Sequence, residues 1–417
     1  MLDIIGKSMT EWKTYKIGEL CKISSSKRIF AKEYKDSGIP FYRGKEIIEK
    51  QKGNKISTEL FISQERYDEI KNKHGVPQEG DMLLTSVGTL GVPYIVKNGE
   101  VFYFKDGNLT WFYDFKNLDS RYLYYWFLSP FGKMNIDSKA IGSTQKALTI
   151  ETLSKFEISL PGLEEQRRIA GILGAIDDKI ESNRRINTNL ESQAQALYKQ
   201  WFVDFEFPNE EGKPYKSSGG KMVDSALGPI PDGWSVGDIY KYIKVIYGAP
   251  YKSALFSERK EGNPLIRIRD LKTFSPQYYT REILPNTEYV NAGDVVAGMD
   301  AEFIPCLWMG EMGVLNQRCC KFIGNQERIS NYYVMCLMKP ELEFAQSYKT
   351  GTTVSHLGKT DIDRFVVIQP ALFIVEKFSI IADALLNNKI KLAKENITLA
   401  TLRDTLLPKL MNGEIKI

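Results

Sequence analysis

Two stretches of this chain repeat one another, and the repeat limits the possible fold more than any other feature of the sequence. Residues 142–161 read GSTQKALTIETLSKFEISLP and residues 351–370 read GTTVSHLGKTDIDRFVVIQP, with Gly, Thr, Leu, Phe and Pro shared at a constant offset of 209. A long helical pattern follows each copy, and looser matches precede each one. Two copies separated by far more than 50 residues indicate a duplicated domain and not a solenoid.

The composition supports two folded domains of mixed type. The chain has 417 residues, of which 43% are hydrophobic, and this is enough to build two cores. Aromatic residues make up 12%, which favours β-rich units. Short apolar runs such as GIPFYRG and NGEVFYF predict strands, whereas ISTELFISQERYDEIK and SRYLYYWFLSPF have helical patterns. We therefore predict the α+β class, with two duplicated mixed α/β domains.

The repeat and the changes in composition predict five segments. The polar, Gly/Pro/Ser-rich stretch after Phe207 has no periodicity and is interpreted as a linker. The predicted segments are a first globular domain at 1–160, a central helix at 161–207, a linker at 208–233, a second globular domain at 234–370 and a C-terminal helix at 371–417.

The two helical segments carry heptad patterns, in which apolar residues alternate steps of four and three. The predicted seam of the first helix is Leu173, Ile176, Ile180, Asn183, Asn187, Leu190, Ala194, Leu197 and Trp201. The predicted seam of the second helix, which Asp404 interrupts, is Leu386, Ile390, Ala393, Ile397, Ala400, Leu407 and Met411. Such helices can pack against each other, with Asn183 and Asn187 fixing the register, or each can cover its own domain.

The sequence offers little material for catalysis, a metal site or a membrane span. It has two histidines, and its five cysteines show no CxxC spacing, so we expect reduced cysteines and no metal. The GKT at 358–360 lacks the first glycine of a phosphate-binding loop, and no Gly-rich turn for a nucleotide or methyl donor appears. No apolar run reaches about 18 residues, and no signal peptide is evident, so we expect a cytoplasmic protein. We predict a protein without catalytic residues or a cofactor of its own.

Basic residues concentrate at matching places in the two copies. Residues 1–55 hold 13 Lys/Arg and 7 Asp/Glu, and residues 239–281 hold 9 Lys/Arg and 3 Asp/Glu, so each segment has a net charge of +6. Such a patch, interleaved with aromatic residues, is typical of a surface that follows phosphates, but a solvated basic face gives the same pattern.

The run LPGLEEQRRIAGILGAIDDKIESNRRINTNLESQAQALYKQWFVDFE, from Leu160 to Glu206, resembles the central conserved region of the specificity subunits of type I restriction-modification systems. The duplication extends this resemblance over the whole chain. The second copy departs from the pattern, because LFIVEKFSIIADALLNN replaces the EEQ and ID elements. This departure makes the two ends chemically unequal as docking surfaces.

The resemblance implies a non-catalytic subunit that recognises double-stranded DNA. In this family each globular unit is a target recognition domain that reads half of a bipartite site, and the two helices form an antiparallel coiled coil that acts as a spacer. The implied partners are DNA, two modification subunits that bring S-adenosylmethionine, and restriction subunits that use ATP and Mg; no membrane is implied. The alternative is a coiled-coil interaction scaffold without DNA contact, which a test of salt-dependent binding distinguishes.

Candidate DNA-binding residues are the basic and hydroxyl side chains of predicted loops. In the first domain they are Ser24, Ser25, Ser26, Lys27, Arg28, Arg43, Lys45, Thr85, Ser86, Thr89, Ser143, Thr144, Gln145 and Lys146. In the second they are Tyr251, Lys252, Ser253, Arg267, Arg269, Lys272, Gln317, Arg318, Thr352 and Thr353.

Overall fold

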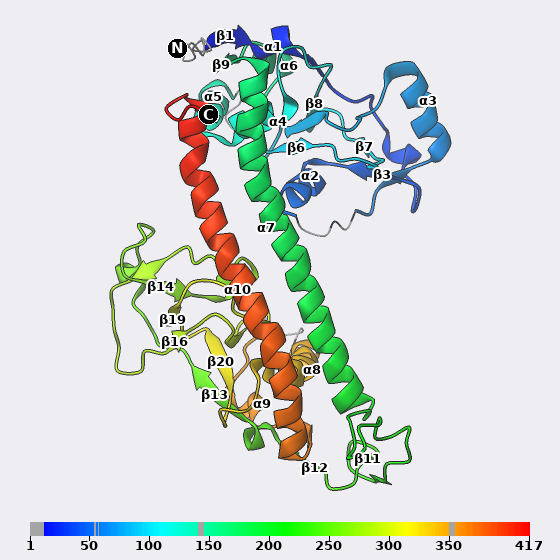
Figure 1. The fold of residues 1–417 in the computed structure, drawn as a ribbon, viewed down its shortest axis with the longest axis vertical. Helices are drawn as coiled ribbons and strands as arrows, with labels where there is room; N and C mark the ends of the chain where they lie inside the picture. Colours follow the sequence, from blue (N-terminus) through cyan, green and yellow to red (C-terminus); the bar gives the residue numbers. More distant parts are fainter. Residues whose placement is uncertain (1–11, 54–55, 57, 141–145, 350–354) are drawn as a thin grey trace, which may run out of the picture. The chain divides into compact units, whose positions relative to one another are not determined.

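The chain folds into two compact units, each of which draws on both long helices (Figure 1). The structure, a computed structural model, describes residues 12–53, 56, 58–140, 146–349 and 355–417. Unit 1 comprises Met1–Glu181 and Thr398–Ile417, and unit 2 comprises Ser182–Ile397. The five segments predicted from the sequence follow a different division, and their boundaries stay predictions.

In its described residues, unit 1 contains three small sheets and six short α-helices, followed by the first part of a long helix. Its strands are β1 (Lys13–Lys16), β2 (Lys22–Ser24), β3 (Ile39–Tyr42), β4 (Phe61–Ile62), β5 (Met82–Thr85), β6 (Pro93–Ile95), β7 (Tyr103–Phe104), β8 (Leu109–Tyr113) and β9 (Glu157–Leu160). Its short helices are α1 (Ile17–Leu20), α2 (Gly44–Gln51), α3 (Gln64–His74), α4 (Ser120–Leu128), α5 (Pro130–Lys139) and α6 (Ile150–Ser154). The helical pattern expected from Ile56 is wrong at its start, because β4 occupies Phe61–Ile62 and the helix begins at Gln64.

Unit 2 has the same kinds of elements in the same order, with a few additions. Its strands are β10 (Met222–Val223), β11 (Ile230–Pro231), β12 (Ser235–Asp238), β13 (Ile243–Tyr247), β14 (Asn263–Ile266), β15 (Tyr279–Thr280), β16 (Tyr289–Val290), β17 (Val295–Gly298), β18 (Pro305–Leu307), β19 (Gly313–Leu315), β20 (Cys319–Gly324) and β21 (Val366–Gln369). Its short helices are α8 (Asn331–Lys349) and α9 (Lys359–Ile362). The long helices are α7 (Leu163–Tyr198), which ends in a π-helical turn at Lys199–Val203, and α10 (Leu372–Met411).

The sheets confirm the duplication strand by strand. The antiparallel sheet β2-β8-β5-β6 of unit 1 matches β13-β20-β17-β18 of unit 2. In the second sheet of each unit, one parallel pair (β3 with β7, β14 with β19) adjoins an antiparallel neighbour (β4, β15). The pair β1-β9 matches β12-β21. Two domains of one topology follow from the repeated sequence, as predicted.

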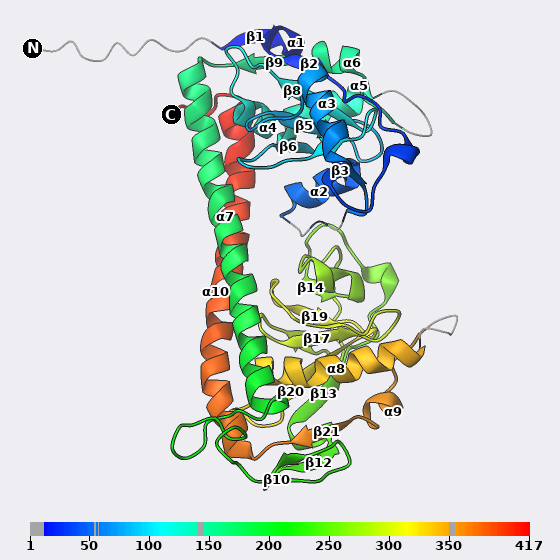
Figure 2. The same ribbon diagram turned by 90° about the vertical axis from the view of Figure 1, so that its right-hand side faces the viewer.

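Each central sheet is buried on both faces, because successive side chains of a strand point to opposite sides. In β5, Met82 and Leu84 join one core cluster, and Leu83 joins the other. In β17, Val295 and Ala297 lie in one cluster, and Val296 lies in the other. Figure 2 shows α8 running across the sheet of unit 2 that contains β17 and β20. A sheet held on both sides is a rigid base for the loops at its ends.

The helices α7 and α10 pack antiparallel, as the family resemblance implied, and they lie side by side in both views (Figures 1 and 2). Within unit 2, Asn183 donates to Asn396 (2.9 Å), and Glu191 pairs with Lys389 (2.5 Å). A later residue of α7 thus pairs with an earlier residue of α10, as expected for antiparallel helices. Within unit 1, Asp177 pairs with Arg403 (2.8 Å). Neither helix covers one domain alone, because each contributes to both units.

None of the residues of the predicted α7 seam is exposed, and Asn183 is fully buried. In the predicted α10 seam Leu386 and Leu407 are buried, whereas Ile397 is 36% exposed. The two seams stay predictions. The residues that face α7 include Lys389, Asn396 and Arg403, which are spaced by seven. Lys389, Asn396 and Arg403 face α7 because polar side chains of α7 bind them. An apolar heptad pattern instead places the following residue of each pair, at positions 390, 397 and 404, in the contact with α7.

The segment at 208–233 is folded, and the expectation of an aperiodic linker is wrong. It forms the two-stranded sheet β10-β11, and the Tyr215 ring stacks on Phe207, which in turn stacks on Trp234. Phe207 and Ile230 are buried in the core of unit 2. Aromatic residues at both ends attach a polar segment to the domain.

Candidate nucleic-acid interface

Four chain segments meet at one end of the central sheet of unit 1 and are joined mainly through their backbones. The Ser86 N–H donates to the Asn108 carbonyl (2.8 Å), and the Leu148 N–H donates to the Ser86 carbonyl (2.9 Å). A β-bridge joins Val87 to Ala147, and the Gly107 N–H donates to Ser25 Oγ (3.4 Å). The loops that carry the SSSKR and TSVGTLG sequences and the segment at 146–148 are therefore adjacent, although they are far apart in the chain.

Unit 2 builds the same junction from the matching segments. The Met299 N–H donates to the Arg318 carbonyl (2.8 Å), and the Leu357 N–H donates to the Met299 carbonyl (2.7 Å). A β-bridge joins Asp300 to His356. The segment after β13 attaches through the Gln317 N–H, which donates to the Ala249 carbonyl (2.9 Å).

A fifth segment, the turn after β3 or β14, reaches each junction. A Cβ added to Gly44 would lie 3.8 Å from Thr85, and a Cβ added to Gly298 would lie 3.1 Å from Ile268. We call the set Ser25, Gly44, Ser86, Asn108 and Ala147, with the loops that carry them, the first loop cluster. The corresponding set of unit 2, named the second loop cluster, is Ala249, Ile268, Met299, Arg318 and His356.

The arginine of each turn is held by a buried carboxylate three residues later. Arg43 donates to Glu46 through its backbone N–H (2.8 Å) and its guanidinium (2.7 Å), and Glu46 is only 1% exposed. Burial works to raise the pKa of Glu46, but these hydrogen bonds outweigh it and hold the pKa below its ordinary 4.5. In unit 2 the Arg267 N–H donates to the buried Asp270 (3.0 Å), and the Arg267 guanidinium stacks on Tyr278. These two arginines hold the turns in place.

The predicted recognition residues divide into exposed and buried groups. The exposed ones are Lys27, Arg28, Lys45, Thr89, Lys146, Lys252, Ser253, Arg269, Lys272, Gln317 and Arg318, and the partly exposed ones are Ser24, Ser25, Ser26, Arg43 and Arg267. Ser143, Thr144, Gln145, Thr352 and Thr353 lie outside the described residues.

Thr85, Ser86 and Tyr251 are buried, and the structure does not support them as surface contacts. Thr85 Oγ1 accepts from the Val92 N–H (2.9 Å), and Ser86 Oγ lies 2.6 Å from Thr110 Oγ1. The Tyr251 hydroxyl donates to Thr287 Oγ1 (3.0 Å). Their hydroxyls satisfy polar groups inside the domain, and a hydroxyl pattern in the sequence cannot distinguish this use from a contact with DNA.

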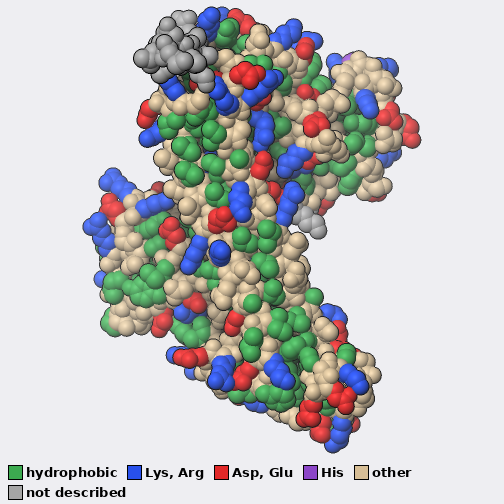
Figure 3. Space-filling model, in the orientation of Figure 1, with side chains coloured by type: hydrophobic (Ala, Val, Ile, Leu, Met, Phe, Trp, Pro, Cys, Tyr) green, Lys and Arg blue, Asp and Glu red, His purple; other side chains and the backbone are tan. Residues whose placement is uncertain are grey.

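Carboxylates accompany the exposed basic side chains of both clusters. Arg28 pairs with Asp106 (2.8 Å), Lys272 with Glu302 (2.6 Å) and Arg318 with Asp300 (2.9 Å). On the face shown in Figure 3, basic and acidic side chains are interspersed over both units. The net charge of +6 in each predicted segment therefore does not appear on that face as one continuous basic patch.

Asp300 and His356 belong to the second loop cluster but were not among the predicted site residues. The His356 Nδ1 atom lies 2.6 Å from Asp300 Oδ1, and Arg318 Nη1 contacts the other carboxylate oxygen. The repeat placed His356 opposite Ala147 and so pointed away from a role shared by the two domains. A role confined to one domain was left open.

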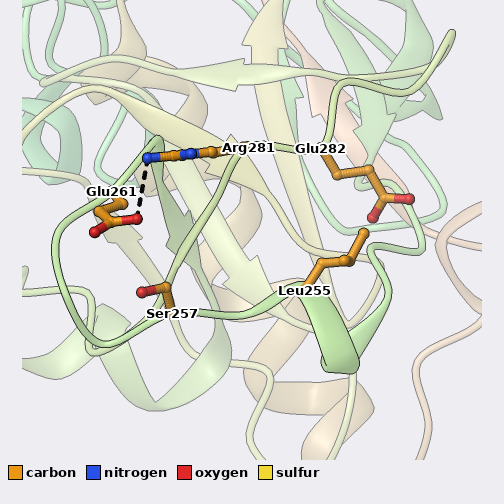
Figure 4. A pocket seen from close by; sticks show the side chains of 5 residues that line it. All are labelled: Leu255, Ser257, Glu261, Arg281 and Glu282. Carbon is orange, nitrogen blue, oxygen red and sulfur yellow. Dashed lines mark hydrogen bonds and ion pairs between the residues drawn. The ribbon is translucent and has the colours of Figure 1, made fainter.

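The second unit also contains a pocket of about 370 Å³, lined by Leu255, Ser257, Glu261, Arg281 and Glu282 (Figure 4). Arg281 pairs with Glu261 (3.0 Å) across it, and Glu282 lies on the other side, beside Leu255.

Among the described residues, His, Cys, Asp and Glu form no group that could hold a metal ion. In that same part of the chain, no helix has both the length and the apolar character that a membrane span requires.

Comparisons with known proteins show what the chain is similar to. Residues 9–192 match Methylase_S, the type I restriction modification DNA specificity domain. The type I restriction enzyme MjaIX specificity subunit of Methanocaldococcus jannaschii is 27% identical over 441 residues, which span 99% of this chain and 95% of that protein. Over its whole length the chain is thus similar to a specificity subunit of a type I restriction enzyme.

Further specificity subunits are similar to the chain in sequence or in fold. The type I restriction enzyme EcoBI specificity subunit of Escherichia coli is 28% identical over 191 residues, which cover 45% of this chain and 40% of that protein. The crystal structure of the S subunit from M. genitalium aligns with a TM-score of 0.56 at 15% identity and covers 98% of both chains. The fold of a specificity subunit thus extends over the whole chain.

Proposed function

We propose that this chain reads a bipartite site in double-stranded DNA, one half with each loop cluster. The observation that carries the proposal is the duplicated junction, which presents exposed Lys and Arg side chains at matching ends of two rigid sheets. Such side chains neutralise phosphates, whereas neighbouring polar side chains can read base edges. The resemblance of the whole chain to specificity subunits supports the same function.

The proposal includes a scaffolding role without catalysis. The chain holds two modification subunits, which bring S-adenosylmethionine, and restriction subunits, which use ATP and Mg. Support comes from the match of residues 9–192 to the type I restriction modification DNA specificity domain and from the length of the helices α7 and α10, of 36 and 40 residues. Purified chain incubated with duplex DNA and S-adenosylmethionine is expected to form no methyladenine, and product formed by the chain alone would contradict this role.

Salt-dependent binding tests the DNA-reading role. The complex with modification subunits is titrated with a duplex that carries its site, at several salt concentrations. We expect the logarithm of the affinity to fall linearly with the logarithm of the salt concentration. Lys27→Gln, in the first loop cluster, should reduce the magnitude of that slope by about one and weaken all sequences alike.

The matched control is Lys73→Gln, which removes the same charge from an exposed lysine at the end of α3. It should leave the slope unchanged. A complex that shows no salt-dependent DNA binding would favour the interaction scaffold instead. An equal effect of both lysine variants would show that general charge, and not the first loop cluster, attracts the DNA.

A further inference from the structure

Asp300 connects two exposed side chains of the second loop cluster. One oxygen of its carboxylate contacts Arg318 Nη1 (2.9 Å), and the other contacts His356 Nδ1 (2.6 Å). The Asp300 side chain is 20% exposed, whereas those of Arg318 and His356 are 57% and 52% exposed. The carboxylate is thus covered, and the two groups that it holds face solvent.

The first loop cluster lacks this arrangement, although it has the same backbone junction. Hydrogen bonds and bridges place Val87, Asn108 and Ala147 where unit 2 has Asp300, Arg318 and His356. Since unit 1 makes the junction with an apolar side chain at the position of Asp300, the fold does not require a carboxylate there. A requirement that belongs to unit 2 alone, such as its own half-site, explains the difference.

Arg318 keeps unused donors after it pairs with Asp300. Its Nη1 atom is the one in contact with the carboxylate, and in the part of the chain that the structure describes, Nε and Nη2 make no hydrogen bond. A guanidinium offers donors in a planar fork, which matches the O6 and N7 acceptors of guanine in the major groove. An arginine that is already held loses less side-chain freedom when it binds, because its orientation is set in advance.

We infer that Asp300 is a positioning residue that holds Arg318 to read a guanine in the half-site of unit 2. His356 holds the second carboxylate oxygen and so prevents the carboxylate from turning away. The inference rests on the proposed DNA-reading function and specifies the base class for one half-site. It assigns specificity in unit 2 to a pair that unit 1 does not have.

The test asks whether the Arg318 side chain contacts the N7 atom of one guanine. The half-site of unit 2 is first assigned by cross-linking from Gln317→Cys, which neighbours Arg318, in the complex with modification subunits. Each guanine of that half-site is then replaced by 7-deazaguanine, which lacks the N7 acceptor. One replacement should weaken binding by the unmodified complex by roughly five- to 150-fold, as for a lost bidentate contact.

Protein variants show whether Arg318 and Asp300 act through that atom. With Arg318→Ala, binding should already be weaker, and the same 7-deazaguanine should cause no further loss. Asp300→Asn keeps the size of the side chain but removes its charge, so it should reduce the penalty for 7-deazaguanine while the other half-site and the thermal midpoint stay unchanged. Glu261→Gln, which removes a carboxylate paired with Arg281 in the pocket of Figure 4, is the matched control and should not alter discrimination.

Two results would overturn the inference and leave the proposed function intact. A unit 2 half-site without guanine would do so. A loss in Arg318→Ala that is equal for all sequences and reduces the salt slope by about one would identify a phosphate contact. By contrast, a complex of unmodified chain that binds no DNA sequence preferentially would contradict the proposed function itself.

Discussion

At the residue scale, a buried ionic network stabilises unit 1 away from its loop cluster. The Tyr94 hydroxyl donates to Glu100 (2.6 Å), and Lys50 forms an ion pair with the same carboxylate. The Lys50 ammonium also lies 5.1 Å from the centre of the Tyr94 ring and 5.4 Å from that of Tyr42. Burial works to raise the pKa of Glu100, but Lys50, Tyr94 and a backbone N–H outweigh it, so the pKa lies below its ordinary 4.5.

The lowered pKa of Glu100 predicts how its contribution to stability changes with pH. A carboxylate with a depressed folded pKa stabilises the protein above its unfolded pKa, and this stability is lost as the pH falls through the folded value. Glu100→Gln should therefore reduce the free energy of unfolding by about 1–3 kcal/mol at pH 7 and by less below about pH 4.5. Urea unfolding at both pH values measures this, with the exposed Glu69→Gln as a control that should change stability little at either pH. A loss that is equal at both pH values would contradict the assigned ionic role.

The sequence indicated which loops carry basic and hydroxyl side chains better than it indicated which of those side chains are exposed. The repeat and its basic flanks identified the SSSKR, TSVGTLG and GAPYKS loops, and the structure brings these loops to matching ends of the two sheets. Burial of Thr85, Ser86 and Tyr251 depends on tertiary packing, which no local pattern encodes. Asp300 was not a candidate, because the candidates were basic and hydroxyl side chains of predicted loops.

At the element scale, the register of α7 against α10 rests on polar pairs and not on apolar contacts alone. The Lys389 side chain is 10% exposed and contacts Glu191, and Asn183 donates to Glu395 (3.0 Å) and Asn396 (2.9 Å). Buried polar groups must find partners, so a shift of one helix past the other by a turn would leave these groups unsatisfied. Alanines at positions 382, 393 and 400 give little apolar contact that could specify a register.

A charge exchange tests this account of the register. Glu191→Lys places a second ammonium beside the buried Lys389 and should reduce the free energy of unfolding by about 1–3 kcal/mol. Combining it with Lys389→Glu restores opposite charges, so the double variant should recover much of the loss. A double-mutant cycle on urea unfolding gives the coupling energy, and a coupling near zero would show that other contacts set the register.

At the scale of the whole molecule, both long helices pass through both units. Under the proposed function, the length of this helix pair sets the gap between the two half-sites. We predict that seven extra residues after Glu181, with seven more after Ile397, keep the heptad phase and add about 10 Å. The recognised site should then gain about three base pairs of spacer with unchanged halves.

Methylome sequencing of cells that carry the lengthened variant measures the spacer directly. An active enzyme with an unchanged spacer would show that the helices do not act as the ruler. Two extra residues at each place serve as the control, because they rotate the following seam residues out of phase and should destabilise the helix pair.

The division of α10 between the units also affects how the protein is made. Leu407, Leu410 and Met411 are buried in the same cluster as Ile169, Leu173 and Trp126 of unit 1. The ribosome synthesises this stretch only after all of unit 2, so unit 1 cannot complete its core while it emerges. Unit 2, which is continuous in the chain, can fold before the core of unit 1 is complete. A premature stop codon near residue 398 would therefore remove part of the core of unit 1 and leave the residues of unit 2 intact.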